Sequence, residues 1–441
     1  MRANSFIANP NAIVMYIDMN SFFASCEQQD NEELRGRPVG VCPFASPTAC
    51  VIAPSIEAKK FGVKTGMRLN ECRALCPDII PVSARPHRYR WYHIEIMKVL
   101  HSYCDDVMAK SIDEAVINLT SYRLVYKNLK DLAFKIKEDI RKACGDFVKC
   151  SIGIAPNSFL AKLGTELQKP DGLVQITPEN VDEHLKKLKL TDLPGIARAN
   201  EKRLLMIGIK NPYEMRHSSP AILRKAFGGI VGHYWHCRLN FMEVDLYENN
   251  YRAMSATRSV SKAQRENKQA LEGLFISLCT RLEQRMVKQS VFCREAGFFI
   301  KYKDFTRWDT HVRFTYPVQD AMDLRHYLED RIREFEKAHS VEMFNPQTQH
   351  LGVIISKFIK TEHVSYTLFD NKMKQDKLRL VMYSIKDRFG KDIVRKACET
   401  VAPNEYKDAI GFGSVKDMYG SLVDKEGNTY KEVINKYLLE E

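Results

Sequence analysis

Short apolar runs that end at acidic residues form the clearest pattern in the first third of the chain. The run at 13–17 ends at Asp18, and a pair of runs within 107–119 flanks Asp113 and Glu114. β-prone runs of this length predict strands, and the second pair predicts a β-hairpin. Adjacent residues in a flat strand point to opposite faces, whereas a hairpin bend lets Asp113 and Glu114 face the same side. We therefore expect three carboxylates to converge at strand ends, where hard divalent cations find oxygen ligands.

Helical and strand patterns alternate through the next part of the chain. Apolar residues at helical spacing predict helices over 89–102, 129–144 and 158–168, and a β-prone run predicts a strand over 150–155. Residues 29–84 form a small module with polar edges and several prolines. These patterns indicate a catalytic core that is interrupted by a small inserted module.

The segment 193–197, Leu-Pro-Gly-Ile-Ala, precedes a helical pattern over 200–206 and resembles a helix-hairpin-helix. Such a hairpin presents backbone N–H groups to a DNA phosphate at a helix N-terminus. Gly195 stands at the turn, and Ala197 replaces the usual second glycine. An ordinary packing unit of two helices is the alternative.

The pattern between 253 and 362 predicts the order β-α-β-β-α-β, a split βαβ fold. Its expected elements are a strand at 257–262, a helix at 270–287, strands at 295–302 and 310–314, a helix at 320–338 and a strand at 351–358. Basic residues lie on or near these strands: Arg252, Arg258, Lys262, Lys301, Lys303 and Arg307. If they share one face, they form a groove floor for duplex phosphates. Strand alternation could instead divide them between the two faces.

Composition narrows the class of protein. The chain has 441 residues, a hydrophobic fraction of 44% and a formal net charge of +12, which favours a polyanionic partner. We expect no signal peptide, no membrane span and a cytoplasmic location. The 12 cysteines are scattered through apolar segments, which predicts buried reduced thiols. Cys72 and Cys76 have no second pair at a zinc-like spacing, so no structural zinc is expected.

Five short motifs, in order along residues 12–365, resemble those of Y-family (DinB/UmuC-type) translesion DNA polymerases. They are Tyr16–Ala24, Glu57–Gly66, Ser111–Ala115, Ser151–Ala155 and Lys169–Gly172. The resemblance implies a right-hand polymerase with an α/β (α+β) multidomain fold. It implies a palm at 1–28 and 85–176, small fingers at 29–84, a helical thumb at 177–246, a βαββαβ little finger at 253–362 and a C-terminal extension at 363–441.

The resemblance also assigns roles to individual residues. Asp18 and Asp113 would bridge two Mg²⁺ ions (Mn²⁺ is an alternative), Glu114 would hold the ion at the primer end, and the Met19 carbonyl would ligate the nucleotide-side ion. The expected dNTP-binding residues are Phe22, Phe23, Ile52, Lys59 and Lys169. Phe23 matches the steric gate that excludes a ribose 2′-hydroxyl, and Ile52 would lie over the nascent base pair.

Two parts of the chain depart from the commonest family pattern. The fingers motif carries Ile56 and Lys59 where many members have Tyr and Arg, a variant closer to the polymerase V (UmuC) branch. The segment 365–369 resembles a degenerate sliding-clamp peptide whose Leu368 and Phe369 could fill a partner pocket. The alternatives are that these two residues pack on their own domain or contact a regulatory subunit. A helix over 375–388 that ends at Gly390 is also expected.

The resemblance implies an error-prone enzyme of DNA repair, damage tolerance and the SOS response that binds primer-template DNA and dNTPs. The main alternative is a non-catalytic, polymerase-like DNA-binding accessory protein, but such proteins lose metal carboxylates that are present here. A helix-hairpin-helix glycosylase or nuclease would not explain Phe23 or the paired acidic motifs. A nucleotidyl cyclase would have no use for the module at 253–362.

Overall fold

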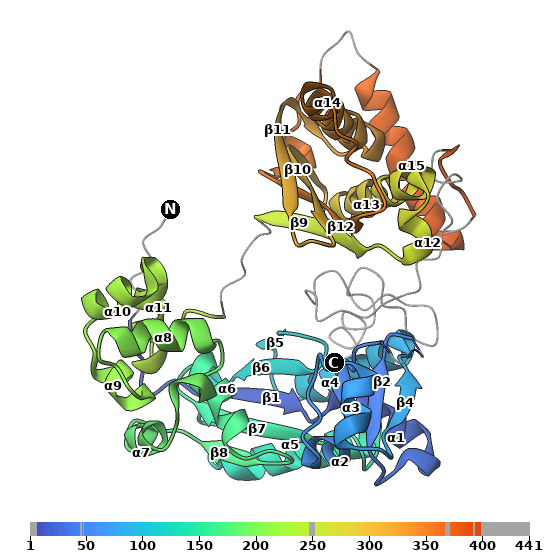
Figure 1. Cartoon of the computed structure of the whole chain (residues 1–441). Coiled ribbons are helices and arrows are strands. Elements are labelled where there is room, and N and C mark those ends of the chain that lie inside the picture. The colour runs from blue at the N-terminus through green and yellow to red at the C-terminus, as the bar shows by residue number, and fades with distance from the viewer. Residues whose placement is uncertain are drawn as a thin grey trace. The chain divides into compact units, whose positions relative to one another are not determined.

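The computed structural model describes residues 7–44, 46, 48–246, 252–366, 371–390 and 393–397. These residues form two compact units, one up to residue 246 and one from residue 252 onward. Both units combine sheets with helices that cover them (Figure 1). The predicted α/β (α+β) multidomain class is confirmed.

Unit 1 is built around a five-stranded sheet whose strands lie in the order β5-β6-β1-β7-β8 (Figure 1). The strands are β1 (Val14–Met19), β5 (Val107–Ala109), β6 (Glu114–Asn118), β7 (Cys150–Ala155) and β8 (Leu173–Gln175). β5 and β6 pair antiparallel, which confirms the predicted hairpin. β1 lies between β6 and β7 and is antiparallel to both, so the strands that carry Asp18 and Glu114 are neighbours.

Helices cover both faces of this sheet. They are α1 (Phe22–Asp30), α4 (Pro86–His101), α5 (Leu129–Cys144) and α6 (Ser158–Leu167). Met15 and Ile17 belong to the apolar core formed with α4 and α5, whereas Val14 and Tyr16 belong to the core formed with α6. Because side chains alternate along a strand, Asp18 lies on the same side of the sheet as α6.

α6 approaches β7 closely because two glycines lie at their contact. A Cβ on Gly153 would stand 1.9 Å from the carbonyl oxygen of Ala161, and a Cβ on Gly164 would stand 3.1 Å from the Cα of Gly153. Real Cβ atoms do not tolerate the first distance, so β7 needs glycine at this position. The glycine contact therefore fixes how near α6 comes to the strand of Asp18.

The module at 29–84 has its own small sheet and core. It contains η1 (Glu32–Leu34), β2 (Val39–Cys42), β3 (Ala53–Pro54), α2 (Ile56–Lys60), α3 (Leu69–Leu75) and β4 (Ile80–Ser83), and the strands lie in the order β3-β2-β4. Its core includes Val51, Ala58 and Cys72. The described cysteines of the whole chain form no disulfide, and all of them are buried except Cys50, which the sequence pattern had placed in an apolar segment.

The last part of unit 1 is helical. This part contains α7 (Val181–Lys186), η3 (Leu190–Asp192), α8 (Arg198–Met206), α9 (Pro212–His217), α10 (Pro220–Phe227) and α11 (Ile230–Leu239). The short η2 (Thr120–Tyr122) lies earlier in the chain, between β6 and α5. The predicted turn lies between η3 and α8, and Gly195 adopts a φ of +95° there. This left-handed conformation favours glycine, and Ala197 follows as the residue that caps α8.

Unit 2 is built on a five-stranded antiparallel sheet: β11-β10-β12-β9 lie in this order, the short β13 pairs with β10, and α13 and α14 pack against the sheet. Its elements are β9 (Ala253–Ser259), α12 (Lys262–Arg265), α13 (Lys268–Lys288), β10 (Val291–Tyr302), β11 (Arg307–Val318), α14 (Ala321–His339), β12 (Thr348–Ser356), β13 (Ile359–Lys360) and η4 (Thr361–His363). This order confirms the predicted split βαβ fold, to which the short α12 is added.

The expected strand at 257–262 was placed too far along the chain, because β9 runs from Ala253 to Ser259 and Lys262 begins α12. The side-chain oxygen of Ser261 accepts a hydrogen bond from the Gln264 N–H at 3.3 Å, and the Gln264 side chain accepts one from the Ser261 N–H at 3.0 Å. This capping box starts a helix before the strand can reach Lys262.

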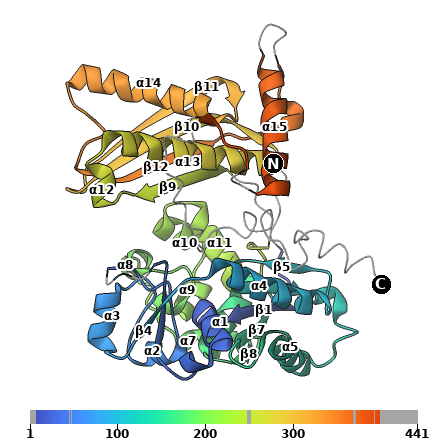
Figure 2. The ribbon, with the colours of Figure 1, turned by 90° about the vertical axis from the view of Figure 1, so that its right-hand side faces the viewer.

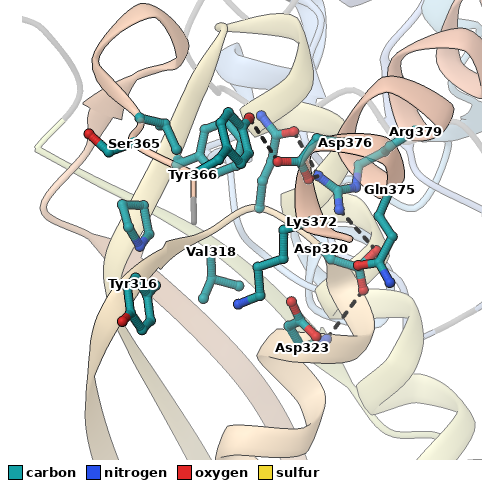
Figure 3. Close-up of a pocket in the computed structure, with 14 residues that line it drawn as sticks. Tyr316, Val318, Asp320, Asp323, Ser365, Tyr366, Lys372, Gln375, Asp376 and Arg379 are labelled. Carbon is teal, nitrogen blue, oxygen red and sulfur yellow. Dashed lines mark hydrogen bonds and ion pairs between the residues drawn. The ribbon is translucent and has the colours of Figure 1, made fainter. Parts of the chain in front are cut away.

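A further helix, α15 (Lys372–Phe389), stands crosswise at one end of α13 and α14 (Figure 2). It ends at Gly390, as the sequence predicted. Polar groups attach it to the unit: Arg379 is 6% exposed and makes ion pairs with Glu283, Asp320 and Asp376. Figure 3 shows Arg379 reaching from α15 toward Asp320. Burial by itself would raise the pKa of Asp320. The hydrogen bond and charge of Lys396, together with the charge of Arg379, instead lower this pKa to about 2.

Candidate active site

The three predicted carboxylates lie at one end of the sheet of unit 1. Asp18 and Glu114 are direct partners across the β1–β6 ladder, and antiparallel partners on one face have neighbouring side chains. Asp113 lies in the hairpin just before β6, and its carbonyl oxygen accepts a hydrogen bond from the Met19 N–H at 2.9 Å. The hairpin therefore brings Asp113 beside the end of β1.

A lysine from α6 reaches this cluster. The ammonium group of Lys162 contacts Asp18 Oδ2, lies 2.5 Å from Glu114 Oε1 and lies 3.2 Å from Glu166 Oε1. The side chain is only 18% exposed. Although burial disfavours the charge, Asp18 and Glu114 raise the pKa of Lys162 above its usual value, so it is charged at neutral pH.

Two further lysines line the same region. Lys169 Nζ lies 3.1 Å from Asp18 Oδ1 and 2.8 Å from Glu166 Oε1. Lys59 comes from α2, and burial together with the nearby charge of Lys169 lowers its pKa. Two neighbouring ammonium groups that repel each other are a suitable receptor for a polyanion such as a triphosphate.

All nine residues that were predicted to bind metal or nucleotide line one cavity of about 240 Å³. They are Asp18, Met19, Phe22, Phe23, Ile52, Lys59, Asp113, Glu114 and Lys169. The sequence interpretation missed Lys162 and Glu166, which also line it. One signal was present, because Lys162 is a charge within the otherwise apolar run Phe159–Leu163; a lysine there needs an acidic partner.

Phe23 is held by aromatic stacking. Its ring stacks on Tyr89 with a centroid distance of 4.4 Å and an interplanar angle of 16°. The Tyr89 hydroxyl donates to Glu27 Oε1 at 2.7 Å, and both rings are buried. Phe23 therefore lines the cavity with a ring that stacking holds in place.

A buried histidine supports the acidic hairpin from behind. His93 on α4 is 2% exposed, and its Nδ1 lies 2.8 Å from the carbonyl oxygen of Ile112. Burial lowers the pKa of His93 to about 4, despite the opposing effect of that hydrogen bond. The ring is therefore neutral at pH 7.

The donor set suits a hard divalent cation, although the carboxylates are engaged with other groups. Among the described residues, no group of three or more His, Cys, Asp or Glu side chains is arranged to hold a metal ion. Lys162 lies between Asp18 and Glu114, and Asp113 Oδ1 accepts a hydrogen bond from Ser111 Oγ at 2.5 Å. Burial and the charges of Glu114 and Asp18 raise the pKa of Asp113. A divalent cation would relieve this repulsion, so the residues fit it once Lys162 moves.

The predicted DNA-binding residues of unit 2 do not share one face. Lys301 and Arg307 are direct partners across β10 and β11, in a row that continues to His350 on β12. Arg258 instead pairs with Leu351, which is fully buried against the helices. The expectation that Arg258 shares this face was wrong, because alternation along β9 turns it toward the helix-covered side.

The other predicted binding residues have less regular positions. Lys303 is exposed in the turn between β10 and β11, and Lys262 begins α12. Leu368 and Phe369, the proposed partner-binding pair, lie outside the described residues. The nearby Tyr366 packs on its own unit, where its hydroxyl donates to Asp376 Oδ2 at 2.9 Å (Figure 3).

Solved structures share this fold. A Y-family DNA polymerase chimera, Dbh-Dpo4(243-245)-Dbh, matches with a TM-score of 0.66 and 24% identity, over 79% of this chain and 99% of that one. An insertion ternary complex of Dbh DNA polymerase matches with a TM-score of 0.54 and 23% identity over the same shares of the two chains. The fold is therefore that of a right-hand Y-family polymerase.

Sequence comparisons give the family. Residues 17–166 match the impB/mucB/samB family and residues 252–368 match the C-terminal domain of that family. DNA polymerase IV of Clostridioides difficile is 28% identical over 81% of this chain and 96% of that protein. DNA polymerase IV of Treponema denticola is 26% identical over 87% and 96%. The chain belongs to the impB/mucB/samB family and is a Y-family DNA polymerase.

Among the described residues, no helix is both long and apolar enough to cross a bilayer.

Proposed function

We propose that this polymerase adds dNTPs to a primer 3′-hydroxyl by two-metal-ion phosphoryl transfer, with low fidelity and past damaged template bases. One observation carries the proposal: Asp18, Asp113 and Glu114, at one end of the sheet, share a cavity with Lys59, Lys169 and the buried ring of Phe23. Metal ligands, a triphosphate receptor and a sugar filter are the parts that nucleotide addition requires.

The residues of the cavity divide this work. Asp18, Asp113, Glu114 and the Met19 carbonyl would hold two Mg²⁺ ions, with Mn²⁺ as an alternative. When bound, the ions would lower the pKa of the primer 3′-hydroxyl and neutralise charge on the triphosphate. Glu114 would hold the ion at the primer end.

The remaining cavity residues bind the nucleotide. Lys59 and Lys169 hold the triphosphate, and the backbone near Phe22 supplies N–H donors. Phe23 occupies the space that a ribose 2′-hydroxyl needs, and Ile52 covers the base pair. Lys59 replaces a bidentate guanidinium by a point charge, and Ile56 lacks the phenol of the usual tyrosine. We assign this fingers motif to the polymerase V (UmuC) type.

DNA contacts would come from both units. Lys301, Lys303 and Arg307 would form the phosphate-binding group of unit 2, and Lys262 at the start of α12 would add a further contact. The backbone around Gly195 and Ala197 would contact one phosphate. We further propose a cytoplasmic location and a sliding clamp or regulatory subunit as the partner of Leu368 and Phe369.

Primer extension on a primed DNA template with Mg²⁺ and dNTPs tests the proposal. The wild type is expected to extend the primer according to the template, and Asp113→Ala/Glu114→Ala is expected to bind the DNA without extending it. A matched control is Asp146→Ala, which removes an exposed carboxylate that does not line the cavity and should extend normally. Equal extension by the wild type and the double variant would refute the assignment, and DNA binding without extension by either would favour the accessory protein.

A further inference from the structure

Lys162 occupies the position between two carboxylates that a divalent cation needs. Its ammonium group contacts Asp18 Oδ2 and lies 2.5 Å from Glu114 Oε1. These two residues are direct partners in the β1–β6 ladder, so their side chains lie close together whatever is bound. Like charges at this distance in a buried site repel strongly unless a cation lies between them.

The position of Lys162 is fixed by the backbone. The residue lies on α6, and the contact of Gly153 with Ala161 and Gly164 holds that helix close to β7. The ring of Tyr16 lies below the ammonium group at 5.3 Å, and the Tyr16 hydroxyl donates to Glu114 Oε2 at 2.9 Å. Lys162 is therefore built into the site, unlike a surface lysine that meets a carboxylate by chance.

A third carboxylate, that of Glu166, lies close enough to accept the ammonium group of Lys162 when a metal ion displaces it. Glu166 lies one helical turn after Lys162 on α6, and its Oε1 is 3.2 Å from Lys162 Nζ. Its side chain is 39% exposed, so it lies toward the open side of the cavity. Lys169 holds the same oxygen at 2.8 Å.

We propose that Lys162 is the polymerase's own counter-cation for the metal site: it holds Asp18 and Glu114 together until a divalent cation displaces it toward Glu166. This inference rests on the proposed function in one respect: it takes Asp18 and Glu114 to be metal ligands. Lys162 is in this sense a positioning residue that competes with the metal. It sets the concentration of divalent cation at which the site fills.

Mn²⁺ binding to the full-length protein, without DNA or nucleotide, tests the competition. Free Mn²⁺ is measured by electron paramagnetic resonance, so the readout does not depend on catalysis. Lys162→Met removes the competing charge at similar length, and we expect Mn²⁺ to bind at least tenfold more tightly. Lys142→Met is the control, because Lys142 pairs with Asp139 on the exposed side of α5, and its Mn²⁺ affinity should equal that of the wild type.

Glu166 provides a test of opposite sign. Glu166→Gln removes the acceptor for the displaced ammonium group, so we expect Mn²⁺ binding to weaken severalfold. The double variant Lys162→Met/Glu166→Gln should match Lys162→Met, because Glu166 acts through Lys162. A double variant that binds Mn²⁺ as weakly as Glu166→Gln would show Glu166 to be a direct ligand and overturn the proposal.

Unchanged or weaker Mn²⁺ binding by folded Lys162→Met would also overturn it. If Lys162→Met does not fold, Glu166→Gln decides alone, and an unchanged affinity there overturns the proposal. Primer extension is measured separately on the wild type in Mg²⁺. Normal extension with unchanged Mn²⁺ affinity in the variants would overturn this inference alone, whereas no extension would overturn the proposed function.

Discussion

The buried imidazole of His93 should make the stability of unit 1 depend on pH. Its pKa is about 4 in the folded protein, compared with 6.5 for an exposed histidine. A depressed folded-state pKa means that below pH 6.5 the unfolded chain binds a proton that the folded chain does not. The stability from this group is therefore complete above pH 6.5 and is lost as the pH falls toward 4.

The magnitude follows from the difference between the two pKa values. At 1.36 kcal/mol per pH unit, the full loss is about 3 kcal/mol, and about 2 kcal/mol of it is lost between pH 7 and pH 5. Asp113 has a raised pKa, so its protonation in acid works in the opposite direction. A comparison of the wild type with His93→Asn cancels the contribution of Asp113, and asparagine retains an N–H group near the position of Nδ1.

Urea unfolding monitored by tryptophan fluorescence measures this effect. Trp308→Phe in both proteins confines the signal to Trp91 and Trp235 of unit 1. Between pH 7 and pH 5, we expect the unfolding free energy of the protein that retains His93 to fall by about 2 kcal/mol more than that of the His93→Asn variant. Parallel pH profiles would show that His93 is not held neutral by burial and would refute the reasoning.

Three further predictions concern the cavity and its packing. Phe23→Leu should raise ribonucleotide incorporation relative to deoxynucleotide incorporation by roughly 10- to 100-fold in single-nucleotide extension; unchanged sugar discrimination would rule out the steric gate. Gly153→Ala should lower the unfolding free energy of unit 1 by about 3 kcal/mol or more, because its Cβ would stand 1.9 Å from the Ala161 carbonyl oxygen. A thermal melt like that of the wild type would contradict this account of the α6–β7 contact. Lys59→Arg should lower the KM for dNTPs by roughly tenfold with kcat little changed, since a guanidinium can bind phosphate through two hydrogen bonds; an unchanged KM would place Lys59 away from the triphosphate.

Local patterns predicted much of the fold. The helix at 129–144 and the strand at 150–155 have the bounds that their apolar periodicity indicates, and the hairpin at Asp113 follows from two β-prone runs that are close in sequence. Beyond such local features, the pairing of β1 with both β6 and β7 depends on contacts that are distant in sequence. The runs that end at these residues indicated that the carboxylates converge, but not that Asp18 and Glu114 are direct partners across one ladder.

The features that the sequence did not predict depend on facing directions. Strand alternation predicts two faces but not which one the helices cover, so Arg258 was assigned to the wrong side. Lys162 was missed because its acidic partners lie on other strands. The attachment of α15 was unforeseen as well, since it buries Arg379 against Glu283 while Leu378 is 70% exposed. A hydrophobic pattern alone predicts that Leu378, rather than Arg379, faces the rest of the unit.

The rate of a single template-matched dNTP addition, as a function of Mg²⁺ concentration, tests the central claim most directly. The wild type and Asp18→Asn are compared on the same primed template, with binding to that DNA measured in parallel. The account predicts Mg²⁺-dependent addition of the matched nucleotide by the wild type. It predicts a loss of at least a thousandfold in Asp18→Asn, since an electrostatic ligand of the reacting groups contributes roughly this much, and an unchanged affinity for DNA. Equal rates in the two proteins would show that the reaction does not take place at this cavity.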